Sequence, residues 1–92
     1  MIELNSKIAV FGLGYVGLPF TAALANVGFK VIGFDIDKEK IEMLKRGEIP
    51  IYEPGLSYLF LRNHKEVRLS FSTNAAEAIR GSEIFFIAPL LL

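Results

Sequence analysis

The chain has 92 residues, and its 10 lysines and arginines balance its 10 aspartates and glutamates, so the formal net charge is zero. A chain of this length forms one small domain, and its hydrophobic share of 52% argues against intrinsic disorder. The charge balance argues against nucleic acid or an anionic membrane as the main partner. Because the chain has no cysteine, disulfides, thiolate metal sites and cysteine nucleophiles are excluded within it.

Targeting and membrane signals are not found in the sequence. Segment 1–6 lacks the basic start and long apolar run of a signal peptide. The longest mostly apolar stretch, Ile84 to Leu92, has nine residues, whereas a membrane-spanning helix needs about 20. We therefore expect a cytoplasmic protein without a membrane partner.

The most informative stretch begins with the apolar run from Ile8 to Phe11, which has the length and composition of a buried parallel strand. The pattern G-x-G-x-x-G follows at once, with its glycines at Gly12, Gly14 and Gly17. In such a loop the first glycine allows a tight turn, the second lets the backbone approach a pyrophosphate, and the third allows close helix packing. A glycine turn that serves only packing is the alternative interpretation.

A helix is predicted from Tyr15 to Val27, with Pro19 in its first turn, where the missing N–H costs nothing, and Gly28 at its end. Its N-terminus would direct free N–H groups and the positive end of the helix dipole at phosphates. Its apolar stripe is expected to comprise four residues: Val16, Phe20, Leu24 and Val27.

A second strand is predicted from Lys30 to Phe34, and it ends at Asp35, 23 residues after Gly12. A carboxylate at this distance can accept hydrogen bonds from the ribose of an adenosine. Because the strand, the helix and the acid all agree with the glycine pattern, we expect a dinucleotide site.

Asp37 is predicted to cap a helix from Lys38 to Arg46 that stops at Gly47. Lys40, in the first turn of this helix and five residues beyond Asp35, would lie close to the adenosine end of the ligand. An ordinary solvated lysine is the alternative.

The remaining elements are predicted more briefly. A helix should start at Pro54, carry Leu56, Leu59 and Phe60 inward, and end near Asn63. The single histidine, His64, lies in a polar patch and is expected in a solvated loop. A third strand is predicted at 67–71, a short helix capped by Thr73 or Asn74 and ended by Gly81, and a fourth, continuously apolar strand at 84–88.

This order of elements predicts the α/β class. We expect the first half of a doubly wound, Rossmann-type parallel sheet, with about four strands in the order 3-2-1-4 and helices on both faces. Residues 1–92 would then form a single half-domain. The fourth strand would be outermost, and nothing in the sequence follows to cover it, so we expect homodimers or higher self-association through this edge.

Several motifs together resemble a known family: GLGYVGLP, VIGFDID with Lys40 beyond it, RGEIPIYEPGL, RLSFSTN and AIRGSEIFFIA. They are similar to the N-terminal NAD-binding domain of the UDP-glucose/GDP-mannose dehydrogenases, nucleotide-sugar 6-dehydrogenases that include UDP-N-acetylmannosamine dehydrogenases. The resemblance runs from Lys7 to about Ala88, which is nearly the whole chain.

The resemblance implies an oxidoreductase of polysaccharide biosynthesis that uses NAD to oxidise the C6 alcohol of a UDP- or GDP-sugar to the uronic acid. It implies two successive hydride transfers, through an aldehyde held on a cysteine. Backbone N–H groups of Tyr15 and Val16 would bind the pyrophosphate, and Asp35 and Lys40 would hold the adenosine end. The expected cofactor-binding residues are therefore Gly12, Gly14, Tyr15, Val16, Gly17, Asp35 and Lys40.

Two departures from the family pattern limit what this chain is expected to do alone. The family's V-x-T-P turn is replaced after Ala88 by Pro89-Leu90-Leu91-Leu92. The catalytic cysteine, lysine and asparagine and the sugar-binding domain of the family lie beyond residue 92. We expect a fragment with no catalytic residue and no metal site, which binds NAD weakly and meets a sugar nucleotide only in a full-length form.

Two other functions remain open from the sequence. One is a stand-alone nucleotide-binding or regulatory module, and the other is an interaction module that assembles through its fourth strand. A ligand titration separates these two, because only the nucleotide-binding module predicts saturable NAD binding.

Overall fold

Four parallel strands form one sheet in the computed structural model, which describes residues 6–49, 55–65 and 68–88. The strands are β1 (Lys7–Phe11), β2 (Lys30–Phe34), β3 (Leu69–Ser72) and β4 (Ile84–Ile87). Their spatial order is β3-β2-β1-β4, with every neighbouring pair parallel. The predicted order 3-2-1-4 is therefore confirmed.

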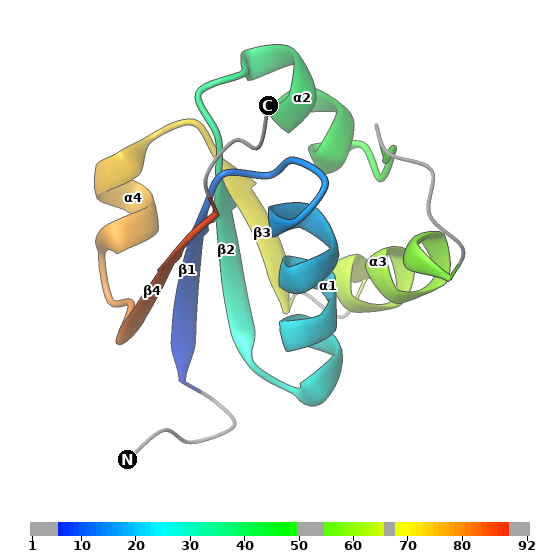
Figure 1. The fold of residues 1–92 in the computed structure, drawn as a ribbon, viewed down its shortest axis with the longest axis horizontal. Coiled ribbons are helices and arrows are strands. Elements are labelled where there is room, and N and C mark those ends of the chain that lie inside the picture. The colour runs from blue at the N-terminus through cyan, green and yellow to red at the C-terminus, as the bar shows by residue number, and fades with distance from the viewer. Residues whose placement is uncertain (1–5, 50–54, 66–67, 89–92) are drawn as a thin grey trace.

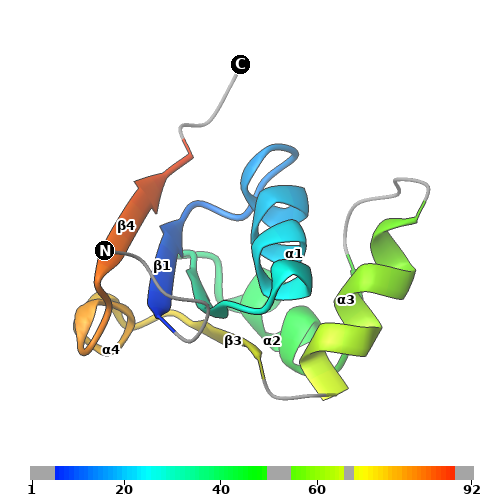
Figure 2. The same cartoon turned by 90° about the horizontal axis from the view of Figure 1, so that it is seen from below.

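Four helices connect these strands: α1 (Gly17–Val27), α2 (Lys38–Lys45), α3 (Leu56–Lys65) and α4 (Ala75–Ile79). In Figures 1 and 2, α1 and α3 lie on one face of the sheet and α4 lies on the other. The expected Rossmann-type architecture, with helices on both faces, is confirmed. No helix in residues 6–49, 55–65 and 68–88 is long and apolar enough to cross a membrane.

Alternating side chains of the strands build a core on each face. On the face of α1 and α3, Ile8, Val10, Val31, Leu69 and Phe71 pack with buried residues of the helices. On the face of α4, a smaller cluster joins Ala9, Ile32 and Ala78, with Phe11 and Phe34 packed against it. Because β1 and β2 are covered on both faces, their central residues are apolar without alternation, as is typical of parallel strands.

The helix α1 buries a different face from the predicted one. Val16 and Val27 are exposed, as is Phe20, whereas the residues turned to the sheet are Gly17, Leu18, Thr21, Ala22 and Ala25. The predicted stripe is therefore wrong except for Leu24, which is partly buried against the core. The physical reason is that α1 is apolar on most of its circumference, so hydrophobic spacing alone does not select the buried face. The face that packs on the sheet carries Leu18 and otherwise small residues, which allow a close approach.

The prediction for His64 is also wrong, because this residue belongs to α3 and is half-buried. Its ring stacks on Phe60 with centroids 5.6 Å apart and an interplanar angle of 8°. Its Nδ1 atom is buried and forms no hydrogen bond within the described residues. Phe60 and Leu56 point inward as predicted, whereas the side chain of Leu59 and residue Pro54 lie outside the described residues.

The fourth strand is an edge strand and is largely uncovered. Phe85 and Phe86 are exposed, and Ile87 is 79% exposed. Phe86 contacts Phe20 of α1 edge-on, with ring centroids 4.9 Å apart. In the described part of the chain, β1 is the only strand that pairs with β4.

Candidate functional site

The glycine loop connects β1 to α1 at the carboxyl ends of the strands, where ligands of open α/β sheets bind. Gly12 has φ of 101°, in the region that favours glycine, and its N–H donates to the Phe34 carbonyl oxygen at 2.8 Å. A Cβ atom at Gly12 would overlap the carbonyl oxygen of Ala88. Two constraints therefore require glycine at position 12: the positive φ of its backbone and the close approach of the Ala88 carbonyl oxygen.

The other two glycines of the motif differ sharply in their surroundings. A Cβ atom at Gly17 would overlap the carbonyl oxygen of Gly12, so the third glycine lets α1 begin directly against the loop. A Cβ atom at Gly14 would meet nothing within 4 Å. The fold itself thus requires the first and third glycines, while the second faces open space.

The N-terminus of α1 opens onto the same space. The N–H of Leu18 donates to Gly14 O at 3.1 Å, and that of Phe20 donates to Val16 O at 3.2 Å. The Tyr15 side chain is 82% exposed, and Val16 is also exposed. Within residues 6–49, 55–65 and 68–88, the backbone N–H groups of Tyr15 and Val16 donate to no protein acceptor. Such N–H groups at a helix N-terminus suit an anion.

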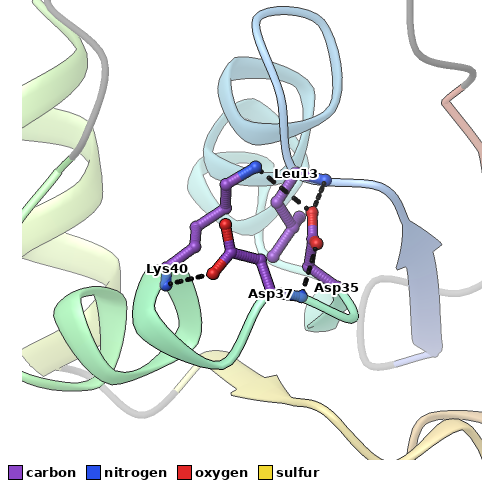
Figure 3. A network of polar contacts seen from close by, with 4 residues as sticks. All are labelled: Leu13, Asp35, Asp37 and Lys40. Carbon is purple, nitrogen blue, oxygen red and sulfur yellow. Dashed lines mark hydrogen bonds and ion pairs between the residues drawn. The ribbon is translucent and has the colours of Figure 1, made fainter.

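Asp35 lies directly after β2 and receives three hydrogen bonds, which Figure 3 shows together. Its Oδ2 atom accepts from the backbone N–H of Leu13 at 3.0 Å and from Lys40 Nζ at 3.4 Å. Its Oδ1 atom accepts from the backbone N–H of Asp37 at 3.0 Å. The carboxylate that the sequence proposed for the ribose therefore also contacts the glycine loop.

These contacts set the ionisation of Asp35. Burial, the largest single influence, disfavours the charge and raises the pKa of this carboxyl. The backbone N–H groups of Asp37 and Leu13, followed by Lys40, favour the charge and together outweigh burial. The pKa of Asp35 consequently lies below its ordinary value, and the group is a carboxylate at neutral pH.

Lys40 is placed by the cap of its own helix. Asp37 caps α2 as predicted, because its Oδ1 atom accepts from the backbone N–H of Lys40 at 3.1 Å. From there the Lys40 side chain, only 23% exposed, turns back to Asp35. Lys40 is therefore partly buried and paired with Asp35, and all seven predicted residues lie at one edge of the sheet.

Sequence reasoning missed two contributors to this arrangement. Leu13 has a fully buried side chain, and its N–H reaches Asp35. Gly33, in the middle of β2, lies under that side chain, and a Cβ atom there would come within 2.9 Å of a Leu13 methyl group. The signal was present in the sequence, since Leu13 is an apolar residue between two glycines and Gly33 interrupts the apolar run from Val31 to Phe34.

Metal ligands do not gather near this edge of the sheet. Among the described residues there is no group of three or more histidines, cysteines, aspartates or glutamates placed to hold an ion. The available chemistry is that of backbone N–H donors beside the carboxylates of Asp35 and Asp37 and the ammonium group of Lys40.

A parallel sheet in this order, with a glycine loop at a helix N-terminus and an acid after the second strand, defines a Rossmann-type dinucleotide-binding domain. Comparison with known proteins gives the family. Residues 6–89 match the model of the UDP-glucose/GDP-mannose dehydrogenase family, NAD binding domain, and the chain belongs to this family. The predicted resemblance is therefore confirmed, and the family indicates NAD as the cofactor.

Individual relatives agree with this assignment. The UDP-glucose 6-dehydrogenase TuaD of Bacillus subtilis is 51% identical over 82 residues, which is 89% of this chain and 18% of the relative. The UDP-glucose dehydrogenase of Pyrobaculum islandicum superposes with a TM-score of 0.86 at 38% identity, over 91% of this chain and 19% of its own.

The UDP-N-acetyl-mannosamine dehydrogenase of Staphylococcus aureus superposes with a TM-score of 0.83 at 38% identity, over 90% of this chain and 19% of its own. The chain thus spans about a fifth of the length of the relatives that it matches.

Proposed function

We propose that this chain is the cofactor-binding part of a nucleotide-sugar 6-dehydrogenase and that residues 1–92 form a single NAD-binding half-domain. One observation carries the proposal. The glycine loop and the acid after β2 meet at one edge of the sheet, where Leu13 N–H lies 3.0 Å from Asp35 Oδ2. Membership of an NAD-binding family supplies the identity of the ligand.

The proposed binding mode assigns a role to each of the seven residues. Gly12 and Gly17 shape the loop, and Gly14 leaves room for the pyrophosphate. The backbone N–H groups of Tyr15 and Val16 donate to its oxygens. Asp35 accepts from the hydroxyls of the adenosine ribose, and Lys40 lies beside it at the adenosine end.

The same geometry favours NAD over NADP. A 2′-phosphate would stand next to the Asp35 carboxylate, and two like charges about 4 Å apart repel by about 1–4 kcal/mol at effective dielectric constants of 80 to 20. Lys40 offsets part of this repulsion, because its ammonium group lies 3.4 Å from the carboxylate. It does not remove the preference, since the carboxylate itself remains charged.

The complete enzyme is proposed to oxidise the C6 alcohol of a UDP- or GDP-sugar to the uronic acid in the cytoplasm. Two hydrides would pass to two molecules of NAD, and one water would supply the second carboxylate oxygen. The 92 residues contain no cysteine to hold the intermediate aldehyde. We therefore propose that the chain alone binds NAD weakly and produces no NADH with any sugar nucleotide.

The chain is also proposed to self-associate when it is studied by itself, with a second copy pairing through β4. Burying about 400 Å² of apolar surface in total over the two partners is worth about 10 kcal/mol at 25 cal/mol per Å². Association costs about 4–15 kcal/mol of lost freedom, so weak to moderate dimerisation is expected. Antiparallel pairing of two β4 strands about a twofold axis would close without leaving a growing edge.

Calorimetric titration of the chain with NAD and with NADP tests the proposed function. We expect saturable, weak binding of NAD and weaker binding of NADP. Absence of saturable NAD binding would favour the alternative of a module that acts only through its β4 edge. Equal or tighter NADP binding would contradict the role of Asp35.

A further inference from the structure

The Asp35 carboxylate joins two loops that follow different strands. Leu13 lies in the glycine loop after β1, and Asp37 begins the loop and helix after β2. The side chain of Asp35 is only 13% exposed, and both of its oxygens are engaged (Figure 3). A residue that served only as an acceptor for a ligand would not need to hold two segments of its own backbone.

The contact with Leu13 belongs to a continuous attachment of the glycine loop to β2. Gly12 N–H donates to Phe34 O at 2.8 Å, immediately before the Leu13 to Asp35 bond. The Leu13 side chain is buried and packs over Gly33. Backbone and side chain of successive loop residues are thus fixed to the end of one strand, just before the loop reaches Gly14.

Resting on the proposed function, we infer that Asp35 is a positioning residue for the phosphate-binding loop as well as an acceptor for the ribose. By holding the Leu13 N–H, the carboxylate fixes the conformation in which Gly14 faces open space and α1 begins with its N–H groups toward the ligand. The binding of the pyrophosphate, which the proposed binding mode places against other residues than Asp35, would then depend on Asp35.

A carboxylate is the side chain that this geometry requires. The N–H groups of Leu13 and Asp37 are accepted by different oxygens of Asp35. Asparagine has one acceptor oxygen, and its NH₂ group would face the second N–H, donor against donor. An Asp35→Asn variant can keep its oxygen toward Leu13 and Lys40 and lose only the Asp37 bond, so Asp35→Ala, which removes both acceptor oxygens, is the variant that tests positioning.

Inorganic pyrophosphate is the probe that separates positioning from ribose binding, because it has no ribose. If Asp35 only binds ribose, Asp35→Ala should bind pyrophosphate as well as the wild type or more tightly, since a nearby negative charge is removed. If Asp35 positions the loop, the variant should bind pyrophosphate about fivefold more weakly, as expected for the loss of the hydrogen bond that holds the Leu13 N–H.

Asp37→Asn is the matched control. It makes the same change in net charge two residues away, and asparagine caps a helix as well as aspartate does. In the wild type, Asp37 Oδ1 accepts from the backbone N–H of Lys40. The asparagine of the control retains an oxygen for this bond. We expect pyrophosphate affinity to be unchanged or slightly increased in this variant.

A second measurement on the wild type needs no variant. The backbone N–H resonances of Leu13 and Asp37 should titrate together with the Asp35 carboxyl in acid, below pH 3.8, while that of Gly47 should not. The charged groups at Asp35 are Lys40 and the neighbouring Asp37, and a Lys40→Met variant should retain the common titration. Hydrogen exchange of the Leu13 N–H should be faster in Asp35→Ala, which has no side-chain acceptor.

The outcomes separate this inference from the proposed function. If Asp35→Ala lost NAD affinity but kept pyrophosphate affinity, Asp35 would be a ribose acceptor only, and the inference alone would fail. The inference would also be overturned if the N–H resonance of Leu13 did not shift as the Asp35 carboxyl titrates. If the wild type bound neither NAD nor pyrophosphate, the proposed function would fail as well.

Discussion

At the scale of single residues, the site depends on a balance at Asp35 between burial and hydrogen bonding. Burial alone would raise the pKa of Asp35. The N–H groups of Asp37 and Leu13 and the ammonium group of Lys40 lower it, and together they outweigh burial. The charge is therefore held by the protein before any ligand arrives. Preorganisation of this kind reduces the ordering that a bound dinucleotide must impose on the loop.

The lowered pKa of Asp35 predicts a loss of stability in acid. Because the carboxyl binds its proton less readily in the folded chain, its contribution is complete above the ordinary value of 3.8 and disappears as the pH falls through the lower folded value. Asp35→Asn should lower the free energy of unfolding by about 1–3 kcal/mol at pH 7. Urea denaturation of the wild type and of Asp35→Asn between pH 7 and pH 2 measures the acid-induced loss of stability and the effect of the substitution.

The difference between the two proteins is the decisive quantity in that experiment. It should shrink as the pH falls below 3.8, because the wild type then loses the charge that the variant never had. A difference that stays constant between pH 7 and pH 2 would show that Asp35 does not contribute through its charge.

The glycines predict a contrast between binding and folding. Gly14→Val should leave the chain folded, because nothing lies within 4 Å of the added Cβ atom, and should weaken NAD binding at least about tenfold by filling the pyrophosphate space. Gly17→Val should fail to fold, since its Cβ atom would overlap Gly12 O. Circular dichroism and NAD titration test both. Wild-type affinity in folded Gly14→Val would place the phosphate site elsewhere.

At the scale of elements, the sequence predicted every helix and strand, with most boundaries within two residues, because local signals were strong; α1, for example, begins at Gly17 and not at Tyr15. The strand β2 was predicted with both ends correct, and the caps Asp37 and Asn74 accept the expected N–H groups. The strand β3 begins at Leu69 and includes Ser72, beyond the predicted end. Polar Ser72 gave no strand signal, yet Asp35 N–H donates to its carbonyl oxygen.

The buried face of α1 was not predictable from hydrophobic spacing, because several apolar faces compete on this helix. Only the tertiary structure shows that small residues lie against the sheet. The prediction that His64 lies in a solvated loop was wrong for a similar reason. Its neighbours in sequence are polar, but its ring stacks on Phe60, which precedes it by one turn of α3.

The corrected face of α1 predicts unequal effects of two truncations. Leu18 is fully buried, so Leu18→Ala should lower the free energy of unfolding by about 2–5 kcal/mol. Val27 belongs to the stripe predicted from the sequence but is 61% exposed, so Val27→Ala should change stability by less than about 0.5 kcal/mol. Chemical denaturation compares them, and equal losses would restore the predicted stripe.

At the scale of the whole molecule, the proposed binding site and the proposed association edge occupy different parts of the sheet and adjoin at Ala88, whose carbonyl oxygen lies beside Gly12. The glycine loop and Asp35 follow β1 and β2 at the carboxyl ends of these strands. The strand β4, with its exposed residues Phe85, Phe86 and Ile87, is the outermost strand of the sheet (Figure 2). The four-strand order was predictable from the sequence because parallel β-α-β units have one favoured hand. The exposure of β4 followed from its outer place in that order.

The uncovered edge predicts self-association of the 92-residue chain at micromolar concentration. Sedimentation velocity should show a concentration-dependent shift toward dimer. Ile87→Lys should reduce it, because the side chain is 79% exposed and a lysine on an edge strand opposes pairing. Ile36→Lys is the control, since Ile36 is equally exposed but lies at the other site. A monomer at all concentrations would mean that this edge does not pair.

The most direct test of the account maps NAD onto the backbone by NMR. If the glycine loop and Asp35 form the dinucleotide site, NAD should produce its largest shifts in the backbone N–H resonances of Tyr15 and Val16, with further shifts at Asp35 and Lys40. The resonances of β4 and of the outer face of α4 should remain nearly unchanged. Largest shifts along β4, with Tyr15 and Val16 unaffected at saturation, would contradict the account.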